Sequence, residues 1–142
     1  MNWSKDLPVR MVRIVRPTNK FDEVVKFYRD IIGLPELGGF SGHAGYTGVM
    51  VGLPDERYHI EIVTHEEEVE EVKPTREDTL VLYIDDTDKV DKLVKKLIAH
   101  GYHPVEPENP YWAIGGISFE DPDGWGFILM NMKERQRLLD NG

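Results

Sequence analysis

His59 and Glu61 could carry acid–base or ligand-binding chemistry, and they lie two residues apart within residues 58–64. Apolar and polar side chains alternate there, which predicts a strand with both residues on one face. A His–Glu pair on one face could hold a charged imidazole near neutral pH. The pair could therefore act as acid and base or as hydrogen-bond partners of a ligand, or it could lie on the exposed rim of the sheet.

Arg13 is a candidate of opposite charge. It lies in residues 9–15, where alternating apolar side chains predict a strand that cannot continue within a sheet past Pro17. Its guanidinium could bind a carboxylate or phosphate of a ligand. It could instead form an internal salt bridge with Glu61, and we favour the salt bridge.

Aromatic side chains supply a second kind of candidate. Tyr111 and Trp112 follow a loop that contains Pro107 and Pro110, and loops over a cleft commonly carry recognition. The alternative is that they plug the edge of the sheet. Tyr83 alternates with the leucines expected to face a helix, so we expect it to point into a cleft.

His43 and Tyr46 lie in a glycine-rich stretch, residues 38–48. The glycines do not follow the order of a phosphate-binding loop and no helix comes after them, so we reject that function. Tight turns between short strands explain them better. Both residues remain candidates for the border of a pocket.

An internal repeat predicts the elements that position these residues. Ile14 and Leu82 lie at the centres of two predicted strands, and Gly33 and Gly101 each end a predicted helix; both pairs are 68 residues apart. Each half has the order strand, helix, glycine and about three antiparallel strands. The sequence therefore predicts an α+β fold with two tandem βαβββ modules, whose curved, mostly antiparallel sheets surround a shared cleft.

These modules divide the chain, which we expect to form one domain over residues 1–142. A segment rich in glutamate, which we interpret as a solvated linker, separates them. The predicted bounds are module one at about 9–65, the linker at 66–78, module two at about 79–131 and a C-terminal tail at 132–142.

Three stretches of sequence resemble the vicinal oxygen chelate superfamily, which includes glyoxalase I, extradiol dioxygenases, fosfomycin-resistance enzymes and bleomycin-resistance proteins. Residues 21–34 resemble its first-helix signature, residues 58–62 the strand that closes the first module, and residues 120–125 the Asp-Pro-Asp-Gly turn of the second. The resemblance covers about residues 9–131. It implies the two-module fold, and it favours a homodimer.

The resemblance also implies where a metal would be held. Metal-dependent members use four strand positions, two in each module, to hold a divalent ion. In the first module those positions fall on Arg13, or on Met11 after a shift of two, and on Glu61. In the second module one position falls in the strand at 79–84, which contains no His, Asp or Glu, and the other falls on Ile128. Only Glu61 matches a ligand, so we expect no metal or other cofactor, although a divalent metal at an atypical site stays possible.

Composition narrows the partners and the location. The 142 residues include no cysteine, which excludes disulfides, a thiolate nucleophile and Cys-bearing zinc sites. The net charge is −9, and most of the excess lies in residues 66–91, so nucleic acid is not expected as a partner. Without a signal peptide or a membrane-spanning run, we expect no membrane partner and a cytoplasmic location.

Together these observations predict a small-molecule binding protein of the bleomycin-resistance or glyoxalase-like type, without the usual metal site and with an unknown ligand. The alternatives are a glyoxalase- or dioxygenase-like metal enzyme with an atypical site, a metal-free enzyme that uses His59 and Glu61, and an interaction module. The candidate cleft residues are Arg13, His43, Tyr46, His59, Glu61, Tyr83, Tyr111 and Trp112.

Overall fold

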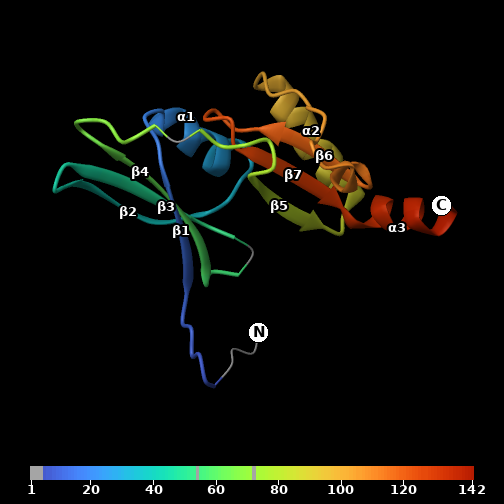
Figure 1. Ribbon diagram of the computed structural model, residues 1–142, viewed down its shortest axis with the longest axis horizontal. Helices are drawn as coiled ribbons and strands as arrows, with labels where there is room; N and C mark the ends of the chain where they lie inside the picture. The colour runs from blue at the N-terminus through green and yellow to red at the C-terminus, as the bar shows by residue number, and fades with distance from the viewer. Residues whose placement is uncertain (1–4, 54, 72) are drawn as a thin grey trace. The chain divides into compact units, whose positions relative to one another are not determined.

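The computed structural model describes residues 5–53, 55–71 and 73–142, and its contacts divide the chain into two compact units (Figure 1). Unit 1 is Met1–Glu71 and unit 2 is Val72–Gly142. Each unit contains an open sheet and at least one helix, so the predicted α+β class is confirmed. The boundary falls inside the acidic segment at 66–78, and the predicted shared cleft stays a prediction.

Unit 1 has the predicted βαβββ order. Its sheet has the strand order β1-β4-β3-β2, in which β1 and β4 are parallel and the other neighbours antiparallel. The elements are β1 (Val12–Pro17), α1 (Phe21–Val25), the π-helical turn η1 (Lys26–Ile31), β2 (Glu36–His43), β3 (Tyr46–Gly52) and β4 (Tyr58–His65).

The first strand and first helix differ from expectation in detail. β1 begins at Val12 rather than at residue 9, and the helix expected over residues 21–32 widens from α to π geometry at Lys26. Its apolar face is buried all the same, and Phe27 and Tyr28 are almost fully covered. Gly33 ends the helix with φ +92°, a backbone conformation that glycine adopts without strain.

Alternation along β4 decides which side chains face the core of unit 1. Ile60 and Ile62 are buried, at 3% and 0% exposure. His59 and Glu61 therefore project from the opposite face. The sequence predicted this arrangement from the period of two.

Unit 2 repeats the same plan with a smaller sheet of order β5-β7-β6, in which β5 and β7 are parallel. Asp86 caps α2 by accepting a hydrogen bond from the Lys89 amide at 3.1 Å, and Gly101 ends it with φ +89°. The elements are β5 (Thr79–Ile84), α2 (Thr87–Ala99), the 3-10 turn η2 (Pro110–Ala113), β6 (Gly116–Glu120), β7 (Gly126–Asn131) and α3 (Met132–Asn141).

The predicted strand near residues 103–105 is wrong. Only one bridge forms there, with the Val105 amide donating to the Ser118 carbonyl at 2.8 Å. Pro104 and Pro107 lack amide hydrogens, so this segment cannot supply a regular ladder. Unit 2 therefore has βαββ order, and its loop at 105–112 is free to fold against the sheet.

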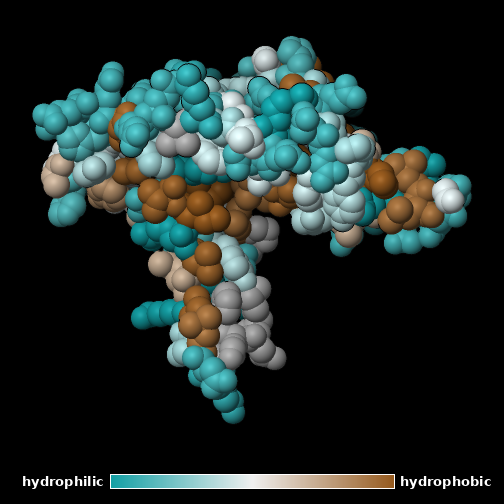
Figure 2. Space-filling view, in the orientation of Figure 1, coloured by the Kyte–Doolittle hydropathy of each residue, from teal (hydrophilic) through white to brown (hydrophobic). Residues whose placement is uncertain are grey.

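Two apolar surfaces remain exposed within the described units. Ile14 and Val15 of β1 are 53% and 49% exposed, and Leu138 and Leu139 of α3 are 38% and 51% exposed. Figure 2 shows apolar surface along both elements. The tail was expected to form one or two helical turns, but α3 extends over ten residues. No helix among the described residues is long and apolar enough to cross a membrane.

Candidate functional site

Arg13, His59 and Glu61 come together in unit 1, and we call them the Arg13 cluster. Parallel pairing sets Arg13 opposite His59 and Val15 opposite Glu61. The Arg13 Nη1 donates to Glu61 Oε1 at 3.3 Å, and Nη2 lies 3.4 Å from His59 Nδ1. The side chains of Arg13 and Glu61 are 33% and 14% exposed, so the salt bridge favoured from the sequence is present and partly covered.

The hydrogen bonds of the cluster also fix the tautomer of His59. A guanidinium can only donate, so Nδ1 must accept from Arg13. A carbonyl oxygen can only accept, so Nε2 must donate to the backbone oxygen of Glu56. Both ring nitrogens of His59 therefore have partners within the protein.

The turn that carries Glu56 is held by a second ion pair. Arg57 Nη2 donates to Asp55 Oδ2 at 3.0 Å, and the Arg57 amide donates to Asp55 Oδ1 at 3.0 Å. The side-chain hydrogen bond from Arg57 lowers the pKa of Asp55 below its usual 3.8. The predicted turn at residues 55–57 thus presents the Glu56 carbonyl to His59.

His43 and Tyr46 lie apart from the Arg13 cluster. They face each other across the β2–β3 hairpin, and no hydrogen bond, ion pair or ring contact within the described ranges joins either residue to the cluster. The Tyr46 ring instead packs edge-on against His65, with centroids 4.5 Å apart. His65 was not predicted as a site residue, although it continues the alternation of His59 and Glu61 along β4.

The hydrogen bonds of His65 explain its place. Its Nδ1 accepts from the Glu67 amide at 3.0 Å, and its Nε2 donates to the Ala44 carbonyl at 3.1 Å. The ring therefore links the β2–β3 turn to the end of β4. This is a structural role, and it accounts for the position of Tyr46.

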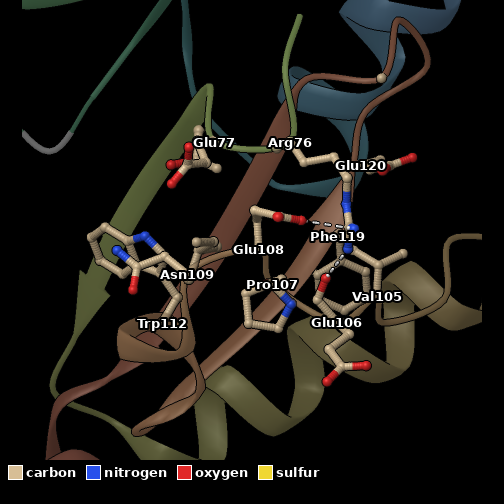
Figure 3. Close-up of a pocket in the computed structure, with 15 residues that line it drawn as sticks. Arg76, Glu77, Val105, Glu106, Pro107, Glu108, Asn109, Trp112, Phe119 and Glu120 are labelled. Atoms are coloured by element: carbon tan, nitrogen blue, oxygen red, sulfur yellow. Dashed lines mark hydrogen bonds and ion pairs between the residues drawn. The ribbon is translucent and has the colours of Figure 1, made fainter.

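Unit 2 contains a pocket that we call the Trp112 pocket (Figure 3). Its empty space is about 430 Å³, including solvent at the open mouth. Trp112 of η2 and Val105 of the preceding loop contribute to its wall, while Ser118 of β6 and Ile128 of β7 line it from the sheet. Ser118 is only 7% exposed, and its Oγ has no hydrogen-bond partner among the residues that the structure describes.

Several contacts fix the aromatic wall of this pocket. Asn109 Oδ1 caps η2 by accepting from the Tyr111 amide at 3.0 Å. The Arg135 guanidinium lies 4.4 Å from the centroid of the Tyr111 ring, and that ring packs edge-on against Trp112 at 5.0 Å. Tyr111 therefore packs between α3 and Trp112, whereas Trp112 lines the pocket. The part played by Arg135 was not foreseen, because α3 was taken for a short exposed tail.

Charged side chains border the pocket. The Arg76 Nη1 forms an ion pair with Glu108 Oε2 at 2.8 Å, and Nη2 donates to the Glu106 carbonyl at 2.8 Å. Figure 3 shows the Arg76–Glu108 pair, with Glu77 elsewhere on the border. The sequence does not predict that these acids lie together, because a loop of irregular structure offers no period from which to place them.

Tyr83 lies on β5 in unit 2 and is 57% exposed. Its parity matches that of Val81, which pairs with Ile128, so it shares the sheet face of the Trp112 pocket. It is not among the residues that line the pocket. Five candidates thus lie in unit 1 and three in unit 2, and their convergence on one cleft stays a prediction.

The donors at the family's metal positions do not fit a divalent ion. The Arg13 guanidinium already binds Glu61, and Ile128 offers no lone pair. Within the part of the chain that the structure describes, no three His, Asp or Glu side chains are grouped so that they could hold a metal.

Comparison with known proteins shows which protein family the chain belongs to. Residues 12–63 match the YycE-like N-terminal domain family, and residues 77–131 match the YycE-like C-terminal domain family. The uncharacterized protein YycE of Bacillus subtilis (strain 168) is 43% identical over 122 residues, which are 86% of this chain and 88% of that protein. The chain belongs to the YycE-like family.

Solved structures extend the comparison of this YycE-like protein. A crystal structure of YycE from Bacillus subtilis, of unknown function and suggested to be a glyoxalase or fosfomycin resistance protein, has a TM-score of 0.86 and 39% identity, covering 92% of this chain and 95% of that one. Leishmania major glyoxalase I has a TM-score of 0.67 and 21% identity, covering 93% of each chain.

An antibiotic binding protein, TnmS3 from Streptomyces sp. CB03234, has a TM-score of 0.59 and 22% identity, covering 85% of this chain and 93% of that one. The resemblance to the vicinal oxygen chelate superfamily is therefore confirmed. At these low identities, glyoxalase I and TnmS3 show a shared fold alone. Because one of them is an enzyme and the other a binding protein, the fold of this YycE-like protein does not decide between the two functions.

Proposed function

We propose that this YycE-like protein binds a small molecule and does so without a divalent metal at the superfamily's usual position. The ion pair between Arg13 and Glu61 carries the proposal. It occupies the place where the resemblance puts two of the four metal ligands. A guanidinium there has the charge of a cation but cannot donate a lone pair.

The electrostatic repulsion between Arg13 and a metal ion at this position is large. Two unit charges 4 Å apart interact by about 4 kcal/mol at an effective dielectric constant of 20. A divalent ion beside Glu61 would be repelled by Arg13 about twice as strongly, and the further donor in the cluster, His59 Nδ1, already lies against Arg13. The position therefore favours an internal salt bridge over a metal.

Unit 2 supports the binding part of the proposal. Ile128, at the remaining acidic position of the family, forms part of a pocket wall together with Trp112 and Val105. Pockets that bind small molecules are largely apolar with a few placed polar groups, and this composition matches that description. A metal-free enzyme that uses His59 is less well supported, because both ring nitrogens already bond within the protein.

The proposal extends to location and assembly. We propose a cytoplasmic homodimer whose only ligand is a small molecule, with neither nucleic acid nor membrane as a partner. The half-exposed Ile14 and Val15 of β1, on opposite faces of the strand, support an assembly of two copies, since burial of either side chain would favour association. Light scattering on the purified chain, over a range of concentrations, measures the assembly.

Metal analysis tests the central claim. The full chain is treated with a chelator, dialysed, and titrated with Zn²⁺, Ni²⁺, Mn²⁺ and Mg²⁺ while metal content and melting temperature are measured. We expect far less than one equivalent of bound metal and no change in melting temperature. Tight binding of one equivalent, reversed by chelator, would overturn the proposal.

A pair of variants makes the metal test specific. Arg13→Ala removes the competing cation and leaves Glu61 available, and Arg16→Ala removes a neighbouring arginine of β1 as the control. We expect neither variant to bind metal, since Glu61 and His59 are two donors and zinc sites use at least three protein ligands. Metal binding by Arg13→Ala only would mean that the other ligands exist and that Arg13 merely blocks them.

A further inference from the structure

We propose that the Trp112 pocket binds a small aromatic cation, with its ring against the Trp112 indole and an ammonium group donating to Ser118 Oγ. This inference rests on the proposed small-molecule function and names its site and ligand class. The pocket lies wholly within unit 2, and Figure 3 shows its border. Its empty space of about 430 Å³ includes solvent at the open mouth, so a ring bound against Trp112 stays partly exposed.

Ser118 is the observation that points to a ligand. Its hydroxyl is buried, with the residue 7% exposed, and it has neither a donor nor an acceptor within hydrogen-bond distance. A buried polar group left unsatisfied costs about 1–3 kcal/mol. Because Ser118 lines the pocket, a bound molecule that displaces the atoms covering Oγ can supply the partner that the protein does not.

The charged side chains around the pocket determine whether a cationic or an anionic ligand group is favoured. Four carboxylates and one guanidinium line the pocket: Glu77, Glu106, Glu108, Glu120 and Arg76. Arg76 is paired with the Glu108 carboxylate and also donates to the Glu106 carbonyl, so its charge is already offset within the protein. The remaining field is negative, which attracts a cation and repels a carboxylate or phosphate.

The indole of Trp112 selects for an aromatic or cationic group. Indole faces stack on aromatic rings and attract cations. The side chain is held by its contact with Tyr111, which Arg135 covers in turn. A wall fixed in this way loses little conformational entropy when a ligand binds.

The backbone places this wall close to the sheet. Gly116 of β6 has no Cβ, and an added Cβ would collide with the Trp112 carbonyl oxygen. Val105, on the other side of the pocket, is tied to Ser118 by the single bridge between them. The loop that failed to form a strand is thus fixed at two points, one at Val105 and one at Trp112.

The test uses three probes of the same shape and different charge: benzylamine, benzyl alcohol and benzoate. Each is titrated into the full-length, ¹⁵N-labelled protein, and dissociation constants come from the shift of the Trp112 indole N–H signal. We expect benzylamine to bind at least tenfold more tightly than benzoate, with benzyl alcohol between them. Added salt should weaken the binding of benzylamine and leave the binding of benzyl alcohol unchanged.

Matched variants locate the contacts. Ser118→Ala should weaken benzylamine about tenfold without loss of stability, because it removes an unpaired buried hydroxyl. Ser41→Ala, at an exposed serine of β2 in unit 1, is the control and should change neither quantity. Glu77→Gln should weaken benzylamine severalfold and leave benzyl alcohol unchanged, whereas Glu66→Gln in the acidic segment should have no effect.

The outcomes separate this inference from the proposed function. Equal binding of benzoate and benzylamine, full affinity in Ser118→Ala, or no Trp112 shift with any probe would overturn the pocket and its ligand class. Each of those results leaves metal-independent binding elsewhere in the protein intact. Stoichiometric metal in the chelator experiment would overturn the proposed function, whichever probe binds at Trp112.

Discussion

Units 1 and 2 share a topology but differ in whether the polar side chains on their sheets have partners. Each begins with a strand and a helix ended by a left-handed glycine, and each pairs its first strand in parallel with its last. In unit 1 the polar groups on the last strand, His59 and Glu61, are bonded to Arg13. In unit 2 the buried hydroxyl of Ser118 on β6 has no hydrogen-bond partner among the described residues. The comparison teaches that a module can bind a ligand through its polar groups only where the protein itself leaves those groups without hydrogen-bond partners.

The loops account for much of this difference. Unit 1 continues from its helix into the full β2–β3 hairpin, whereas the corresponding chain of unit 2 makes a single bridge and a 3-10 turn. Two prolines near Val105 prevent a regular strand there. The loop then folds into a pocket wall, so the lost strand and the new pocket have the same cause.

The largest effect that we predict tests whether the two cores are built alike. Phe27 in unit 1 and Phe127 in unit 2 are both fully buried. Phe27→Ala and Phe127→Ala should each lower the free energy of unfolding by about 3–5 kcal/mol, since each removes a ring and leaves a cavity. Urea unfolding followed by circular dichroism measures both. A loss below about 1 kcal/mol in one variant alone would mean that this unit's core is loosely packed.

A smaller effect is predicted for the close approach that builds the pocket. Gly116→Ala should cost about 1–3 kcal/mol, because its Cβ meets the rigid Trp112 carbonyl, and it should also weaken benzylamine binding. Gly38→Ala in β2 is the control in unit 1: its Cβ would meet only the flexible Met50 side chain at 3.4 Å. Thermal unfolding and the probe titration compare the two. Equal effects in both variants would show that the Trp112 contact is not special.

Much of the fold could be predicted from the sequence because it depends on local signals. Periods of two and 3.6, the helix-ending Gly33 and Gly101, and the cap at Asp86 all act over a few residues. The repeat interval then gave the two modules. The strand near Val105 was mispredicted because its apolar residues suggested pairing while Pro104 and Pro107 removed the donors that pairing needs.

The candidate sites were harder to predict, since they depend on contacts between distant residues. A contact between Arg13 and Glu61 could be predicted from the sequence only because the family resemblance sets their strands side by side. Ser118 carries no local signal, because its significance lies in the partner that it lacks in the folded chain. Arg135 was missed for a similar reason: only the fold brings α3 to Tyr111.

Breaking the Arg13 cluster tests whether unit 1 uses its charges for stability alone. Glu61→Gln should lower the free energy of unfolding by about 1 kcal/mol, a modest value because Arg13 is one-third exposed to solvent. Benzylamine affinity should not change. Arg13→Met and the double variant complete a cycle that isolates the energy of the pair. A tenfold loss of probe affinity in Glu61→Gln would contradict the separation of roles between the units.

The smallest effect that we predict concerns two exposed ion pairs, one in each unit. Arg57 lowers the pKa of Asp55 below 3.8, and Arg137 lowers the pKa of Glu134 below 4.5, in both cases chiefly through a side-chain hydrogen bond. A lowered pKa in the folded state means that the ionised carboxylate stabilises the fold above its usual pKa. That contribution is lost as the pH falls through the folded-state value.

Asp55→Asn and Glu134→Gln should therefore be slightly less stable than the parent protein at pH 7, and each difference should shrink once the pH falls below 3.8 for Asp55 and 4.5 for Glu134. Urea unfolding at a series of pH values measures it. Asp55 holds the turn that offers the Glu56 carbonyl to His59, so only Asp55→Asn should also alter the His59 ring signals in NMR spectra. If Glu134→Gln altered them equally, the turn would not be what positions His59, and the separation between the units would fail at this point.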